Sequence, residues 1–154
     1  MIKEKANIAV FISGRGTNLK ALILRSKKKT CNYKIAYVIS NKKNAAGLKI
    51  AKKNQIITKV ISQSFLKIEQ KKLAKILINK NIKFICLAGF MKILSPYFIN
   101  FFKNKVINIH PSLLPKYKGL NTHKRAIEAK EKFSGCTIPV SYTHLTLPTM
   151  DHGW

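Results

Sequence analysis

An asparagine and a histidine, Asn108 and His110, stand two residues apart at the end of a short apolar run, 105–109. If that run is a strand, both side chains project from one of its faces. An amide donor beside an imidazole can hold an oxyanion and move a proton, as acyl transfer requires. Pro111 favours an extended backbone at His110, which would fix the direction of the ring. The alternative is a structural pair, with both side chains hydrogen-bonded within the fold.

A second segment with possible chemistry is 13–19, SGRGTNL, which joins an apolar run to a helix-like one. Glycines let a ligand approach the backbone, and a helix N-terminus offers free N–H groups that suit a phosphate. Leu19 stands where the dinucleotide-binding fingerprint has its third glycine, so the segment is not that motif. A plain tight turn is the alternative.

The third segment is 87–96, LAGFMKILSP, in which an apolar strand ends at a glycine and an apolar loop follows. Such a loop could cradle a flat heterocycle, with backbone groups reading the edge of the ring. The alternative is that Met91, Ile93 and Leu94 are ordinary core residues.

Strand-like and helix-like segments alternate along the whole chain, which predicts an α/β fold with an open, mostly parallel twisted sheet and helices on both faces. Ligands of such sheets bind at the carboxyl ends of the strands, where all three segments lie. The predicted strands are 7–12, 34–40, 56–61, 83–88 and 105–109, and the predicted helices are 18–28, 45–53, 67–79, 96–102 and 123–130, the last capped by Thr122.

Length and composition predict one globular domain, because 46% of the 154 residues are hydrophobic. No apolar run reaches the roughly 18 residues that a membrane span needs. The first residues lack the pattern of a secretory signal, so we expect a cytoplasmic protein. Cys31, Cys86 and Cys136 are far apart, and we expect neither disulfides nor a metal site.

The chain is strongly basic, with 30 Lys and Arg residues against five acidic ones. Such a charge can indicate an anionic partner, either a nucleic acid or a phosphorylated substrate. Only Arg15, Arg25 and Arg125 are arginines, and the lysines are spread over nearly every predicted helix. Nucleic-acid binders more often gather arginines and aromatic side chains on one face. We therefore expect small-molecule substrates, with neither a nucleic acid nor a membrane as partner.

Taken together, the motifs resemble phosphoribosylglycinamide formyltransferase, a folate-dependent family of purine biosynthesis. The resemblance covers roughly residues 7–138, and its most specific stretch is the last of four. These stretches are NIAVFISGRGTNL, YVISNKKNAAGL, LAGFMKILSP and NIHPSLLPKYKGLNTH. The resemblance implies formyl transfer from 10-formyltetrahydrofolate, as co-substrate, to the amine of glycinamide ribonucleotide, without a metal.

The resemblance also implies roles for individual residues. Gly16, Thr17 and Asn18 would hold the phosphate of glycinamide ribonucleotide. Asn108 would contact the formyl oxygen, and His110 would act as the proton donor. The pocket for the pterin ring would be lined by Met91, Lys92, Ile93 and Leu94, and a basic folate contact is expected near Lys67 without an exact register.

The family pattern breaks after Ile138. The resemblance places a catalytic Asp near position 146, where this chain has Thr146, and the chain has no Asp before Asp151. No lysine follows Lys132. We therefore divide the chain into an incomplete formyltransferase-like domain, 1–138, which lacks its last strands, and a non-family, artefactual tail, 139–154. Without the Asp, this chain is expected to be inactive.

Two other functions are weighed against formyl transfer. A nucleotide-binding oxidoreductase would need an acidic residue for the ribose hydroxyls, and none lies between Asn18 and Lys67. A basic nucleic-acid-binding module would show salt-dependent binding to random duplex DNA. Titration with NADH distinguishes the first of these from formyl transfer.

Overall fold

The computed structural model describes residues 4–62, 64, 67–117, 122–133 and 135–138. Strands and helices alternate through this part of the chain, as the sequence predicts. The elements are β1 (Ala6–Ile12), α1 (Thr17–Ser26), β2 (Tyr33–Ser40), α2 (Ala46–Lys53), β3 (Ile57–Val60), α3 (Lys67–Asn79), β4 (Ile82–Leu87), α4 (Pro96–Phe101), β5 (Val106–Asn108) and α5 (Thr122–Glu128).

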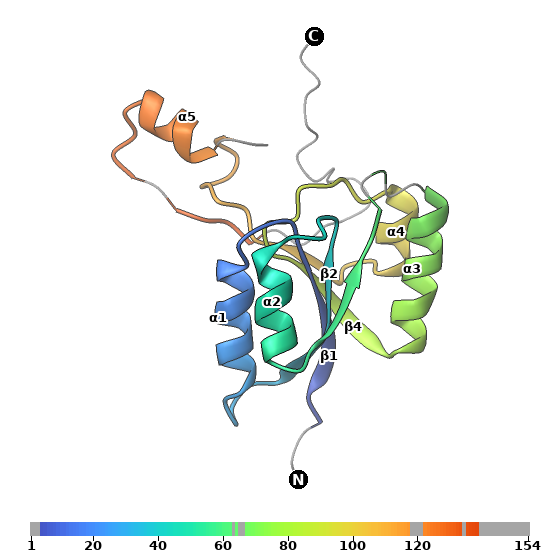
Figure 1. Cartoon of the computed structure of the whole chain (residues 1–154). Helices are drawn as coiled ribbons and strands as arrows, with labels where there is room; N and C mark the ends of the chain where they lie inside the picture. The colour runs from blue at the N-terminus through green and yellow to red at the C-terminus, as the bar shows by residue number, and fades with distance from the viewer. Residues whose placement is uncertain (1–3, 63, 65–66, 118–121, 134, 139–154) are drawn as a thin grey trace.

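The described strands form one parallel sheet in the order β3-β2-β1-β4-β5. Helices α1 and α2 cover one face of the sheet, and α3 and α4 cover the other (Figure 1). The α/β fold expected from the sequence is therefore confirmed. From β1 the chain first proceeds outward to β2 and β3, and then returns to the other side of β1 for β4 and β5. This reversal creates a switch point between β1 and β4, the usual ligand site of such sheets.

Strand β1 lies at the centre of the sheet and is buried on both faces, which explains its nearly continuous apolar run. Val10 and Ile12 pack in the cluster beneath α1 and α2. Phe11 points to the opposite face, where its ring lies 5.9 Å from that of Phe98 in α4. Removing a buried Phe side chain typically costs about 3–5 kcal/mol, so β1 anchors both layers and fixes where the loop after it emerges.

Most element boundaries agree with the sequence predictions to within two residues, and α3 agrees at both ends. Two differences concern the segments nearest the expected site. Strand β5 ends at Asn108, so Ile109 and His110 lie beyond it. Thr122 is the first residue of α5 and not a cap that precedes the helix. Helix boundaries commonly differ by one or two residues between criteria.

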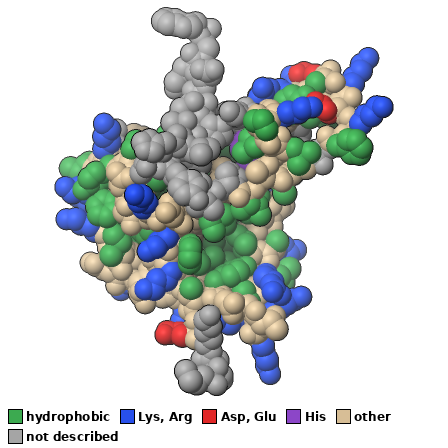
Figure 2. All heavy atoms as spheres, turned by 180° about the vertical axis from the view of Figure 1, so that it is seen from behind, with side chains coloured by type: hydrophobic (Ala, Val, Ile, Leu, Met, Phe, Trp, Pro, Cys, Tyr) green, Lys and Arg blue, Asp and Glu red, His purple; other side chains and the backbone are tan. Residues whose placement is uncertain are grey.

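The surface is uneven in character. Seen from behind, hydrophobic side chains gather near the centre of the molecule, with lysines and arginines around them (Figure 2). Helix α5 stands apart from the two helical layers (Figure 1), and its Ile127 is 76% exposed. Among the described helices, none is both long and apolar enough to cross a membrane.

Candidate functional site

The three segments predicted to carry chemistry follow three adjacent strands. They emerge after β1, β4 and β5, which are neighbours in the sheet. Because all three strands are parallel, the segments meet at the carboxyl edge of the sheet. The loop after β4 lies between the other two, so a ligand on it would be within reach of both.

The loop after β1 presents an uncapped helix N-terminus. Gly16 precedes α1 with a left-handed backbone (φ 79°) and provides no side-chain cap. The first backbone bond into the helix runs from Lys20 N–H to the Gly16 carbonyl at 2.9 Å. The first N–H groups of a helix have no partner within it. Thr17 and Asn18 are exposed, and the first turn contains no acidic residue, so the geometry suits an anion.

A second glycine, Gly47 in α2, packs directly against this loop. Its N–H donates to the Gly14 carbonyl at 3.1 Å. A Cβ placed on Gly16 would lie 2.6 Å from the Gly47 Cα, closer than side chains are found. The two helices therefore approach each other at a point where neither backbone has room for a side chain, which fixes the position of the loop.

Ser13, the first residue after β1, connects this loop to two others. Its hydroxyl donates to Asn41 Oδ1 at 2.6 Å, just after β2. It also accepts from the Met91 N–H at 2.8 Å, in the loop after β4. Both Ser13 and Asn41 are buried. A buried hydroxyl with both roles satisfied holds the loops in a defined relation, because losing either bond leaves a buried polar group unpaired.

The apolar loop after β4 is fixed at both ends and open in the middle. Beyond the Ser13 bond, the Ser95 N–H donates to Oε1 of the buried Gln70 in α3 at 2.7 Å. Met91 and Ile93 are 54% and 46% exposed, whereas Leu94 is buried in the core beneath α3 and α4. Lys92 is half-buried. Two of the four predicted pocket residues thus offer exposed apolar side chains, and Leu94 can contribute only its backbone.

Asn108 and His110 differ in their surroundings. Asn108 is half-buried at the last position of β5, opposite Leu87 of β4. His110 is 3% exposed and pairs through its backbone with Thr137, with both bonds at 2.9 Å. Since the strand expected over 105–109 ends at Asn108, its geometry does not by itself place both side chains on one face. The structure nevertheless brings both residues to the same edge of the sheet.

The two ring nitrogens of His110 differ in their contacts with the described residues. Its Nδ1 lies 2.8 Å from the hydroxyl of the buried Ser112. Its Nε2 is buried and has no hydrogen-bond partner among the described residues. Burial lowers the pKa of His110 from its ordinary value, because a charged ring loses more hydration than a neutral one. The neutral ring is therefore favoured at neutral pH.

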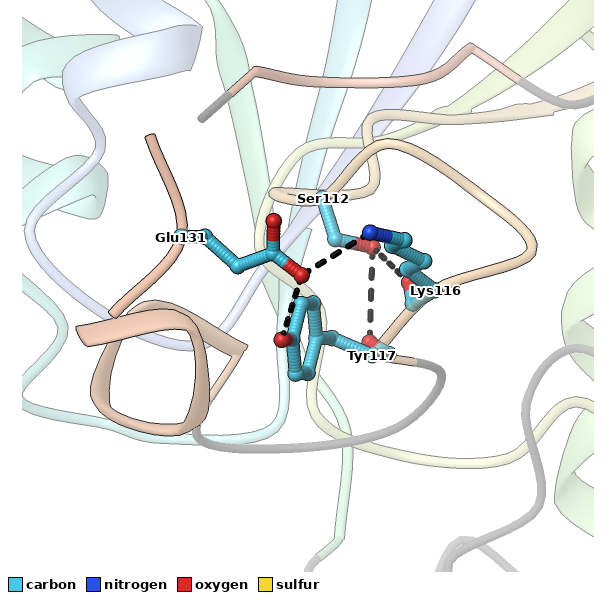
Figure 3. Close-up of polar contacts among 4 residues, drawn as sticks. All are labelled: Ser112, Lys116, Tyr117 and Glu131. Carbon is cyan, nitrogen blue, oxygen red and sulfur yellow. Dashed lines mark hydrogen bonds and ion pairs between the residues drawn. The ribbon is translucent and has the colours of Figure 1, made fainter. Parts of the chain in front are cut away.

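Polar contacts join the loop that follows His110 in the chain to Glu131 (Figure 3). The Ser112 hydroxyl contacts the backbone carbonyls of Lys116 and Tyr117. The side chains of these two residues both reach Glu131, whose Oε1 accepts from Lys116 Nζ and from the Tyr117 hydroxyl at 2.9 Å. The hydrogen bond from Lys116, and to a smaller extent that from Tyr117, lowers the pKa of the Glu131 carboxyl. The pair is exposed to solvent, so its contribution to stability is small.

A cavity of about 330 Å³ lies beside these polar contacts. Residues 111–117 line one part of it, and Thr122, Ala126, Glu131, Phe133 and Gly135 line the rest. Its wall is largely apolar, including Leu113, Leu114 and Phe133. Within the described part of the chain, no group of three or more His, Cys, Asp or Glu side chains could hold a metal. Cys31 and Cys86 are buried and Cys136 is exposed.

Several residues that shape the site have no predicted role in the sequence. Ser13 belongs to the predicted glycine-rich loop, and Asn41 lies between a predicted strand and a predicted helix. Polar residues directly after parallel strands are a usable signal, since the carboxyl ends of neighbouring strands meet. The contribution of Gly47 has no comparable signal, because it depends on how closely α1 and α2 approach.

The fold and the site define an α/β protein with a candidate ligand site at the switch point of its sheet and an asparagine and a histidine beside it. The chain belongs to the formyl transferase family, which it matches over residues 6–153. The family resemblance seen in the motifs is thereby confirmed. The matched range includes residues 139–153, which the sequence motifs separate from the domain.

Individual relatives agree with this assignment. The chain is 47% identical over 135 residues to the phosphoribosylglycinamide formyltransferase of Haemophilus influenzae, covering 85% of this chain and 63% of that protein. It is 44% identical over 138 residues to the trifunctional purine biosynthetic protein adenosine-3 of Gallus gallus, covering 88% of this chain. The crystal structure of phosphoribosylglycinamide formyltransferase from Anaplasma phagocytophilum superposes with a TM-score of 0.85 at 40% identity, covering 92% of this chain and 67% of the other.

The chain spans only part of these relatives. It covers 14% of the trifunctional protein from Gallus gallus and about two thirds of the single-function proteins.

Proposed function

We propose that this chain provides the substrate-binding part of a cytoplasmic phosphoribosylglycinamide formyltransferase. The reaction moves a formyl group from 10-formyltetrahydrofolate to the primary amine of glycinamide ribonucleotide. The observation that carries the proposal is the hydrogen bond from Met91 N–H to Ser13 Oγ. It joins a phosphate-suited loop to an apolar loop at the switch point, as a reaction between a phosphorylated and a heterocyclic substrate requires.

The phosphate of glycinamide ribonucleotide would bind at the start of α1, through Gly16, Thr17 and Asn18. An uncapped helix N-terminus without acidic residues supports this role. The pterin ring would lie on the loop after β4, against the exposed side chains of Met91 and Ile93, with Lys92 at its edge. Leu94 is packed in the core, so its carbonyl or N–H would be the group that contacts the ring.

Formyl transfer begins when the substrate amine attacks the formyl carbon and negative charge develops on the formyl oxygen. Asn108 would donate a hydrogen bond to that oxygen. A protonated His110 would add a second donor through Nε2, the ring nitrogen without a partner in the part of the chain that the structure describes. One such donor is typically worth a factor of about 10²–10³ in rate.

The lowered pKa of His110 conflicts with a role as a charged donor. A nearby carboxylate is the usual means of raising the pKa of an imidazole. Two acidic side chains are described in the segment after His110, and both have basic partners: Glu131 is engaged by Lys116 and Tyr117, and Glu128 Oε1 lies 3.7 Å from Lys124 Nζ. This supports the expectation that an Asp near position 146 completes the family's site, and that this chain, with Thr146 there, lacks efficient catalysis.

Calorimetry on the 154-residue chain tests the proposal directly. Glycinamide ribonucleotide should bind saturably at one site per chain, and 10-formyltetrahydrofolate should bind in its presence. NADH and random duplex DNA serve as the comparison ligands. Binding of NADH, or salt-dependent binding of DNA, without any binding of glycinamide ribonucleotide would refute the proposal and favour one of the other two functions.

A further inference from the structure

The hydroxyl of Ser112 has three polar neighbours but only one hydrogen. It lies 2.8 Å from His110 Nδ1, 2.9 Å from the Lys116 carbonyl oxygen and 3.3 Å from the Tyr117 carbonyl oxygen. A hydroxyl can donate once and accept through its lone pairs. Ser112 is 5% exposed, so exchange of these partners for bulk water is restricted.

The backbone around Ser112 holds the hydroxyl in place. The Ser112 N–H donates to the His110 carbonyl at 2.9 Å. The Ser112 carbonyl accepts from the Thr137 hydroxyl at 2.8 Å, and that hydroxyl accepts in turn from the Leu114 N–H at 2.9 Å. These bonds fix the backbone position from which the Ser112 side chain projects toward Nδ1 and the two carbonyls.

Carbonyl oxygens can only accept, so the hydroxyl hydrogen of Ser112 is directed to them. The remaining contact, with Nδ1, is favourable only if the ring nitrogen donates to the hydroxyl oxygen. The reverse arrangement would direct a hydroxyl lone pair at a carbonyl oxygen 2.9 Å away and would leave that carbonyl without this donor. The neutral tautomer with its hydrogen on Nδ1 therefore satisfies more of these contacts than the tautomer with its hydrogen on Nε2.

We infer that Ser112 is a positioning residue that fixes the neutral tautomer of His110, with the proton on Nδ1 and a lone pair on the unpartnered Nε2. The consequence for catalysis rests on the proposed function, whereas the tautomer rests on these hydrogen bonds alone. Nε2 takes a proton from the attacking amine as the new N–C bond forms and the carbonyl π pair moves to oxygen, and this uptake converts the neutral ring into the protonated donor of the proposed function. The resulting Nε2–H then returns the proton to the folate nitrogen as the old C–N bond breaks.

Nitrogen NMR of the ring tests the inference without any ligand. The 154-residue chain is labelled with ¹⁵N-histidine, and two-bond ¹H–¹⁵N spectra are recorded at pH 8, where neutral imidazole predominates. His110→Gln assigns the signals by removing them. We expect a protonated, pyrrole-type Nδ1 and an unprotonated, pyridine-type Nε2. The opposite pattern in the parent chain would overturn the inference.

Two variants then separate the role of Ser112 from that of the surrounding loop. Ser112→Thr keeps the hydroxyl and should keep the parent pattern. Ser112→Ala removes the acceptor of the Nδ1 proton, so the two ring nitrogens should shift toward an average of both tautomers. An unchanged pattern in Ser112→Ala would show that Ser112 does not set the tautomer, provided that a uniformly ¹⁵N-labelled sample of the variant keeps the β1 and β2 amide signals. Absence of glycinamide ribonucleotide binding would refute the proposed function and leave these spectra unaffected.

Discussion

The hydroxyl of Ser13 accepts a hydrogen bond at 2.8 Å from the backbone N–H of Met91, 78 residues further along the chain. The bond joins the loop after β1 to the loop after β4 across the switch point of the sheet. Asn41 takes the hydrogen of the same hydroxyl at 2.6 Å. The relative positions of the loops after β1, β2 and β4 therefore depend on one buried side chain. A change at Ser13 in the loop after β1 should accordingly affect binding at the loop after β4.

Ser13→Ala should lower the affinity for 10-formyltetrahydrofolate by roughly tenfold, since a lost hydrogen bond with a buried unpaired partner costs about 1–3 kcal/mol. The Met91 amide should also lose its protection from hydrogen exchange. Ser26→Ala is the matched control. Among the described residues, the Ser26 hydroxyl donates only to the carbonyl of Ile23 in the same helix, and Ser26 lies at the end of α1 far from the site. Parental Met91 exchange in Ser13→Ala would contradict the prediction.

Gly16→Val should weaken glycinamide ribonucleotide binding far more than folate binding. A side chain on Gly16 meets the Gly47 backbone at 2.6 Å and occupies a left-handed conformation, so the loop must move away from the phosphate. Calorimetry with each substrate measures the two losses. Gly14→Ala is the control in the same loop, because nothing lies within 4 Å of the Cβ it adds. Equal losses for both substrates in Gly16→Val would remove the loop from the phosphate role.

The arrangement of the sheet could be predicted from the sequence because β1 and β4 carry continuous apolar runs and glycines mark where the chain turns. The expected carboxyl-edge site followed from that arrangement and from the positions of Gly16, Asn108 and the loop at Met91. Side-chain direction could not be predicted in the same way. Met91 and Leu94 are both apolar, yet one is exposed and the other is core, since the choice depends on packing against α3 and α4.

His110 should make stability depend on pH in a definite direction. Burial lowers its pKa in the folded chain, whereas the unfolded chain titrates near the ordinary value of about 6.5. Above that value both states are neutral and the difference vanishes. As the pH falls below about 6.5 the unfolded chain takes up the proton first, so the folded state loses stability until the folded pKa is passed.

Urea unfolding at pH 7.5 and 5.5 measures this loss. His110→Gln cannot take up the proton, so its free energy of unfolding should fall less over the same interval. Comparing the parent with the variant cancels the other histidines, which titrate in both chains. An equal decrease for the two chains would show that His110 is not the group responsible.

Asn108→Ala and His110→Ala should each lower the rate of formyl transfer by about 10²-fold or more, in a chain whose segment 139–154 has been replaced by the C-terminal part of the Haemophilus influenzae relative. The reason is that, under the proposed function, each side chain would provide a donor at the developing charge. Asn100→Ala is the matched control, since Asn100 is an exposed residue of α4. Steady-state rates within threefold of the parent for either variant would remove that residue from the reacting centre.

The same replacement of residues 139–154 tests whether His110 needs a carboxylate. In the 154-residue chain, burial favours the neutral ring and no Asp precedes Asp151, so the charged donor is scarce and transfer should be undetectable. The exposed hydrophobic side chains, among them Phe84 and Phe133, should also make this chain prone to aggregate.

The chain in which residues 139–154 are replaced should be both soluble and active. Replacement with Ala at the Asp position should restore solubility alone, because it covers the surface without raising the pKa of the imidazole. Turnover by the unmodified chain at an ordinary enzymic rate, about 1–10³ per second, would show both that residues 139–154 are functional and that His110 needs no such partner.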